Sequence, residues 1–198
     1  MDSEPVGAKT LGAVTVILVN DNIADRKADV LVNAANNQLQ MGGGVAAALR
    51  SRGGIEIHLE AIRHAPARIG SVVRTAAGQL AAKYVYHAVV IDYDVSKGTS
   101  APDVGETVRN LVKQAAEDGV TSMAMPLFGA GVGGLSVETS LTTILDGLED
   151  SAPSVSSLFG SRLSSGIRKN SSKHAESSTR TRAGRTGRRR RTDSPRKR

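Results

Sequence analysis

The sequence predicts an α/β protein with a largely parallel sheet. Short, β-branched apolar segments alternate along the chain with segments of helical periodicity, which is the pattern of strands joined by crossover helices. Two glycine-rich loops each follow an apolar strand and precede a helix, and ligands of such folds bind beyond the carboxyl ends of the strands. The 198 residues suffice for one domain with a real core plus a tail.

Each predicted strand is an apolar run bounded by turn residues. In chain order the strands cover residues 14–19, 30–32, 71–76, 84–90 and 123–128. The predicted helices are alanine-rich or carry apolar residues at three- and four-residue spacing. They cover residues 45–52, 55–64, a segment from Pro102 to a stop at Gly119, and residues 136–150.

Charge divides the chain into an acidic body and a basic tail. Residues 1–150 carry 12 Lys and Arg against 17 Asp and Glu, a net charge of −5, whereas residues 151–198 carry 14 against 2, a net charge of +12. The tail has little apolar periodicity, so we expect residues 151–198 to be disordered. Two interpretations stay open: a solvated tail without a role, or a segment for nucleic-acid binding or targeting.

Composition excludes several classes of protein. The chain has no cysteine, and its four histidines lack the spacing of zinc ligands, so we expect no disulfide, metal or cofactor. No apolar run approaches the length of a membrane span, and the N-terminus lacks the pattern of a secretory signal. We therefore expect a cytoplasmic protein without membrane contact; the sequence leaves the oligomeric state open.

The two glycine loops carry the functional signal. The first spans residues 33–45, and the second spans residues 129–135. Successive backbone N–H groups beside a helix N-terminus form a cradle for anions, and glycine lets a ligand approach closely. Two such loops at one sheet edge could hold a diphosphate without Lys or Arg, which neither loop contains. The alternative is that the glycines merely close tight turns.

At these residues the chain resembles the macrodomain family, the ADP-ribose-binding modules of the Appr-1″-p processing type. The shared segments are Val32–Asn36, Gly42–Leu49, Tyr84–His87 and Pro126–Gly134. The resemblance implies a three-layer α/β/α fold with a mixed, largely parallel central sheet. It also implies that the body, residues 1–150, lacks the last strand and helix of the family.

The resemblance implies a set of ligand-binding residues. Asn22 and Ile23 would meet adenine, Asn36 would face the distal ribose, and the glycine loops would hold the diphosphate. The implied residues are Asn22, Ile23, Asn33, Asn36, Gly42, Gly43, Gly44, Val45, Gly129, Ala130, Gly131, Val132 and Gly133. Two positions depart from the family: Asn22 replaces an Asp, with Asp21 one place earlier, and Gly133 replaces a frequent aromatic residue.

Binding of ADP-ribose, or of an ADP-ribosylated protein, is the leading functional prediction. The first alternative is hydrolysis of an ADP-ribosyl or O-acyl-ADP-ribose bond by a bound water and Asn36. Ala46 stands where hydrolytic relatives have Asp, and Arg50 stands where they have His, so the usual acid is missing. The second alternative is non-specific binding of nucleic acid through the basic tail.

Overall fold

The computed structural model describes residues 4–94 and 98–163. Its strands are β1 (Pro5–Leu11), β2 (Val14–Val19), β3 (Val30–Asn36), β4 (Val72–Ala76), β5 (Tyr84–Ile91) and β6 (Met123–Ala124). Its α-helices are α1 (Gly44–Gly53), α2 (Ile55–Ala61), α3 (Ala101–Asp118) and α4 (Val137–Leu163). Two short 3₁₀-helices, η1 (Ile23–Asp25) and η2 (Ile62–His64), complete the order. In these residues no helix is long and apolar enough to cross a membrane.

The central sheet is mixed and largely parallel, as predicted. Its strand order is β4-β5-β3-β6. β3 runs parallel to both β5 and β6, and β4 is antiparallel to β5. The carboxyl ends of β3, β5 and β6 therefore lie at one edge, where the glycine loops begin.

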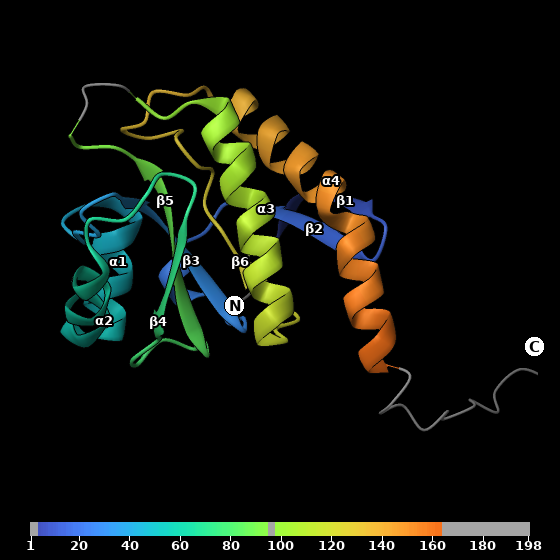
Figure 1. Cartoon of the computed structure of the whole chain (residues 1–198), viewed down its shortest axis with the longest axis horizontal. Coiled ribbons are helices and arrows are strands. Elements are labelled where there is room, and N and C mark those ends of the chain that lie inside the picture. The colour runs from blue at the N-terminus through green and yellow to red at the C-terminus, as the bar shows by residue number, and fades with distance from the viewer. Residues whose placement is uncertain (1–3, 95–97, 164–198) are drawn as a thin grey trace, which may run out of the picture. The chain divides into compact units, whose positions relative to one another are not determined.

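Helices cover both faces of this sheet, which confirms the three layers (Figure 1). Side chains alternate along β3, so its neighbouring residues enter different cores. Val30 and Val32 pack into a cluster with Val108 and Leu111 of α3 and with residues of α4. Leu31 packs into a second cluster, which contains apolar residues of α1 and α2.

β1 was not predicted, and it pairs with β2 in a separate two-stranded sheet. A two-residue turn, Gly12 and Ala13, joins the strands, and Gly12 has a φ of +58°. β1 is exposed except at Leu11 and contains no β-branched run. Pairing with β2 rather than local sequence therefore defines this strand.

Three predicted boundaries were wrong. β3 extends to Asn36, so Asn33 to Asn36 belong to the strand and not to the loop. β6 ends at Ala124, two residues before Pro126, whose missing N–H cannot join a ladder.

The third correction concerns α4, which continues to Leu163 instead of ending at Asp150. Two contacts extend its buried face: the Ser151 hydroxyl donates to the Gly147 carbonyl at 2.7 Å, and buried Ala152 lies beside Gly12 of the hairpin. The predicted domain boundary at residue 150 thus falls inside a helix. The residues after Leu163, which the predicted lack of a last strand and helix concerns, lie outside the described residues. The basic run from Arg185 to Arg198 lies outside the described residues.

Candidate functional site

Three segments leave the carboxyl edge of the sheet together. The first loop follows β3, the second loop follows β6, and the segment that contains Thr99 leads from β5 to α3. Figure 1 shows the last two running along the same end of the sheet. Thr99 ties them to each other: its N–H donates to the Gly133 carbonyl at 3.0 Å, and its hydroxyl donates to the Val90 carbonyl at 2.8 Å. The second loop is therefore anchored to the end of β5.

The glycines of the second loop serve two different purposes. A Cβ on Gly133 would lie 2.4 Å from the hydroxyl oxygen of Thr99, and one on Gly129 would lie 2.9 Å from Thr99 and Leu135. These two glycines are needed for packing. A Cβ on Gly131 would meet nothing within 4 Å, and Val132 beside it is 86% exposed. The fold does not require a glycine at position 131, so close approach of a ligand is a sufficient reason for it.

The tip of this loop presents unpaired donors. Its internal bonds run from the N–H of Gly134 to the Gly131 carbonyl and from the N–H of Leu135 to the Gly129 carbonyl. Within the described part of the chain, the N–H groups of Gly131, Val132 and Gly133 have no acceptor. Consecutive unpaired N–H groups at an exposed tip can receive an anion.

The first loop ends in a second open surface, at the N-terminus of α1. Gly42, Gly43 and Gly44 are exposed, and a Cβ on any of them would meet nothing within 4 Å. Gly43 is the N-cap and provides no side-chain bond, while half-buried Val45 follows in the first turn. The helix dipole and the free N–H groups of this turn favour a negative ligand group.

Asn36 shapes the first loop through its own amide. Its Oδ1 accepts from the N–H groups of Gln38 at 3.0 Å and Gln40 at 3.2 Å, and its Nδ2 donates to the Gln40 carbonyl at 3.0 Å. Leu39, which is 1% exposed, takes a φ of +54° inside this turn. Asn36 is buried, and within the described residues its amide leaves one Nδ2 hydrogen without an acceptor.

Asn33 lies inside the sheet and not at its edge. It is 1% exposed, and its Nδ2 meets His87 Nδ1 at 3.1 Å, while the Thr75 hydroxyl meets His87 Nε2 at 3.1 Å. Burial, with a smaller contribution from the nearby charges of His58 and His64, lowers the pKa of His87 to about 4. This cluster joins β3, β4 and β5 below the site, and its burial argues against direct ligand contact by Asn33.

Sequence reasoning missed two residues that hold the site together, Thr99 and Asn37. The Asn37 Nδ2 donates to Asp92 at 2.9 Å and to Asp94 at 2.6 Å, so it joins the chain after β3 to the chain after β5. No local pattern marks either residue. The one available signal was Ser100, whose spacing to Asp103 is that of a helix cap and places Thr99 just before α3.

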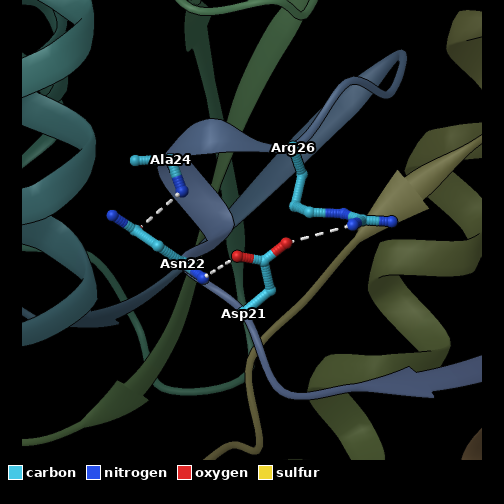
Figure 2. Close-up of polar contacts among 4 residues, drawn as sticks. All are labelled: Asp21, Asn22, Ala24 and Arg26. Atoms are coloured by element: carbon cyan, nitrogen blue, oxygen red, sulfur yellow. Dashed lines mark hydrogen bonds and ion pairs between the residues drawn. The ribbon is translucent and has the colours of Figure 1, made fainter. Parts of the chain in front are cut away.

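The start of η1 holds the predicted adenine-contacting residues. Asn22 is exposed and caps η1, with its Oδ1 accepting from the Ala24 N–H at 3.1 Å. Asp21 accepts from the Asn22 N–H at 2.7 Å and forms an ion pair with Arg26 at 3.1 Å (Figure 2). Half-buried Ile23 packs against the same apolar cluster as α1, and Asp25 of η1 pairs with Arg52 at 2.9 Å, so η1 lies along α1.

Neither of the two positions considered for hydrolysis carries an acid. Ala46 is buried in the cluster beneath α1, and Arg50 is half-buried one turn further on. Among residues 4–94 and 98–163, no group of three His, Asp or Glu side chains could hold a metal ion. Among the described residues, this edge presents backbone N–H groups, amides and the carboxylates of Asp92 and Asp94, which accept from Asn37.

The fold and the site together define a class of protein: a three-layer α/β protein with two open glycine loops at the carboxyl edge of its parallel strands. The family model of the Macro domain matches residues 32–144, and the chain belongs to this family. An uncharacterized protein from Pyrobaculum aerophilum is 35% identical over 153 residues, which cover 75% of this chain and 82% of that protein.

Solved structures agree with this assignment of the fold. The Oceanobacillus iheyensis macrodomain with MES bound has a TM-score of 0.68 at 19% identity and covers 80% of this chain and 95% of that one. The Trypanosoma brucei macrodomain in complex with ADP-ribose has a TM-score of 0.59 at 25% identity and covers 65% of this chain and 53% of that one.

Proposed function

We propose that this protein binds ADP-ribose, free or attached to a protein, at the edge formed by its two glycine loops. The proposal gives the diphosphate to the N–H groups of Gly131, Val132 and Gly133 on one side and to the open N-terminus of α1 on the other. Asn22 and Ile23 take the base, and the Asn36 turn takes the distal ribose. The complex of the Trypanosoma brucei macrodomain with ADP-ribose supports the choice of ligand.

One observation carries the proposal. A Cβ on Gly42, Gly43 or Gly131 would meet nothing within 4 Å and none of the three has a positive φ, whereas the φ of +54° at Gly44 by itself favours glycine. The glycines that face inward, Gly129 and Gly133, are explained by Thr99 and Leu135. A turn alone explains the second group, whereas a bound anion that touches the backbone explains the first.

Titration of ADP-ribose into the full-length protein by calorimetry tests this function, with ADP and AMP as comparators. We expect low-micromolar affinity for ADP-ribose, weaker binding of ADP and the weakest binding of AMP. AMP has a single phosphate and can reach only one of the two groups of N–H donors. A folded protein that gives no heat with ADP-ribose contradicts the proposal.

Hydrolysis of an ADP-ribosyl bond is the second candidate. It would rely on a bound water and the remaining hydrogen of the Asn36 amide, because Ala46 offers no acid or base. Loss of such a group costs about 10²–10⁴-fold in rate. Incubation of ADP-ribosylated protein with excess enzyme, followed by quantification of released ADP-ribose, distinguishes turnover from binding. Nucleic-acid binding by the tail and a cytoplasmic location remain predictions from sequence.

A further inference from the structure

The segment formed by α2 and η2 carries a cluster of exposed apolar side chains. Ile55, Leu59 and Ile62 are 48%, 47% and 37% exposed, and they are three of the eight exposed large apolar residues of the described chain. Their spacing of four and then three residues places them on one face of the helix. The opposite face, with Ile57 and Ala61, is buried in the protein. The outer face, named here the α2 stripe, is therefore apolar without a partner inside the described chain.

The charges beside the α2 stripe have opposite signs at its two ends. Glu56 lies in the first turn of α2 and Arg63 in the last turn of η2, and both side chains are exposed. They are seven residues apart, which is about two helical turns, so they follow the same flank of the stripe. Among residues 4–94 and 98–163 neither of them forms an ion pair. In an antiparallel pair of such segments, Glu56 of each would face Arg63 of the other.

We propose that the α2 stripe is the contact through which two copies of this protein form a two-fold symmetric dimer. Leu59 lies close to the middle of the segment between Ile55 and Ile62. A two-fold axis at Leu59 therefore places this residue opposite its own copy, and it places Ile55 opposite Ile62. The same axis places Glu56 opposite Arg63. A surface that is its own complement, in shape of pattern and in charge, fits a second copy of the chain.

The size of the α2 stripe determines how strong the dimer is. Three partly exposed side chains from each copy form a smaller contact than the interface of about 1,600 Å² that is standard in stable complexes. We therefore expect weak association, with a dissociation constant of about 0.1 mM. The contact uses none of the residues proposed to bind ADP-ribose, so the dimer and the proposed function can fail separately.

Sedimentation equilibrium of the full-length protein tests the dimer, at concentrations from a tenth of the expected dissociation constant to ten times that value. The average mass should rise from the 20.6 kDa of the monomer toward twice that mass. Leu59→Glu brings two carboxylates together at the two-fold axis and should weaken association by at least about tenfold. The matched control is Val137→Glu, which introduces the same acid at a residue of α4 that is 61% exposed. Thermal unfolding should show both variants folded, because surface substitutions are nearly neutral.

A charge exchange tests the antiparallel arrangement itself. Glu56→Arg or Arg63→Glu alone places like charges opposite each other at two symmetric positions, and each should weaken the dimer by about fivefold. The double variant restores both pairs and should recover the wild-type dissociation constant. A wild type that stays monomeric throughout overturns the proposal, and so does association that Leu59→Glu leaves unchanged. Single charge variants without any loss, or a folded double variant that does not recover, overturn the two-fold pairing.

Discussion

The second loop contains two kinds of glycine, which differ in whether an added side chain would clash with the fold. Gly133 and Gly129 close a tight contact with Thr99, and replacing either forces the loop to move. Gly131 faces open space, so its replacement should leave the fold intact and affect only what binds. This difference allows binding to be separated from stability at a single position.

Gly131→Glu should abolish ADP-ribose binding, because it brings a carboxylate to the proposed diphosphate cradle. Like charges at an interface cost several kcal/mol, so the loss should exceed about a hundredfold. Gly131→Ala is the control, and both variants should melt within about 2 °C of the wild type, since surface substitutions are nearly neutral. Calorimetry and thermal unfolding measure the two effects. Wild-type affinity in Gly131→Glu would mean that this loop is only a turn.

His87 should make the protein sensitive to mild acid. The pKa of His87 is lowered from 6.5 to about 4. Between pH 6.5 and pH 4 this histidine therefore binds a proton in the unfolded chain but not in the folded protein. Stability is therefore complete above pH 6.5 and falls as the pH drops toward 4, by about 3 kcal/mol in all. Urea unfolding at stepwise pH measures the slope.

His87→Gln should remove most of that slope, whereas His64→Gln, which replaces an exposed histidine, should keep it. If the slope between pH 6.5 and 4 persists in His87→Gln, other groups cause the acid sensitivity.

At the scale of elements, Thr99 couples the second loop to β5. Thr99→Val keeps the shape of the side chain but removes the donor to the Val90 carbonyl. An unpaired buried carbonyl costs about 1–3 kcal/mol. The loop should also lose order, so ADP-ribose affinity should fall along with the melting temperature.

Thr99→Ser retains the hydroxyl and should restore most of the affinity. Calorimetry and thermal unfolding on both variants provide the comparison. A loss in the Ser variant with near wild-type affinity in the Val variant would show that the methyl group, rather than the hydrogen bond, holds the loop.

Elements with local signals were predictable from sequence, and those that depend on distant partners were not. α3 begins beside Pro102 and ends at Gly119, whose φ of +66° only glycine adopts readily. β5 is apolar apart from His87 and was predicted to within one residue. β1 and the extension of α4 are far apart in the sequence but in contact in the fold, because Ala152 packs beside Gly12. Nothing local to either segment indicates that contact.

The candidate site was predictable in place but not in detail. Glycine spacing located both loops, because the strand before each and the helix after each are visible in the sequence. The orientation of the amides was not predictable: Asn36 turns to its own loop, Asn33 to His87 and Asn22 to Ala24. Which atom of an amide remains available depends on neighbours that only the folded chain brings together.

At the scale of the molecule, the acidic body and the basic tail should act independently: we expect the body to bind ADP-ribose and the tail to be responsible for any binding of nucleic acid. A chain that ends at Gly166 keeps the whole of α4 and loses most of the positive charge of residues 151–198. ADP-ribose affinity should not change in this variant. Any binding of nucleic acid by the full-length protein should fall steeply with salt and vanish on truncation. Fluorescence anisotropy with an oligonucleotide at several salt concentrations measures this. Salt-sensitive binding that survives truncation would place it in the body.

The separation of the β1–β2 hairpin from the main sheet has a consequence for local motion. In residues 4–94 and 98–163 no ladder joins the two sheets, so the hairpin can open without breaking a bond of β3 or β5. Contacts that tie the hairpin to the rest of the protein include buried Leu11 and half-buried Val16 in the main core, the approach of Ala152 to Gly12, and an exposed ion pair between Lys9 and Glu149. Amide protons of Thr10 to Val19 should therefore exchange with deuterium when the hairpin alone opens, at a low free-energy cost. Those of Val85 to Val90 should exchange only when the whole domain unfolds. Exchange measured by mass spectrometry should reveal two populations of rates within one cooperative domain, and equal rates would mean that the hairpin unfolds only with the rest.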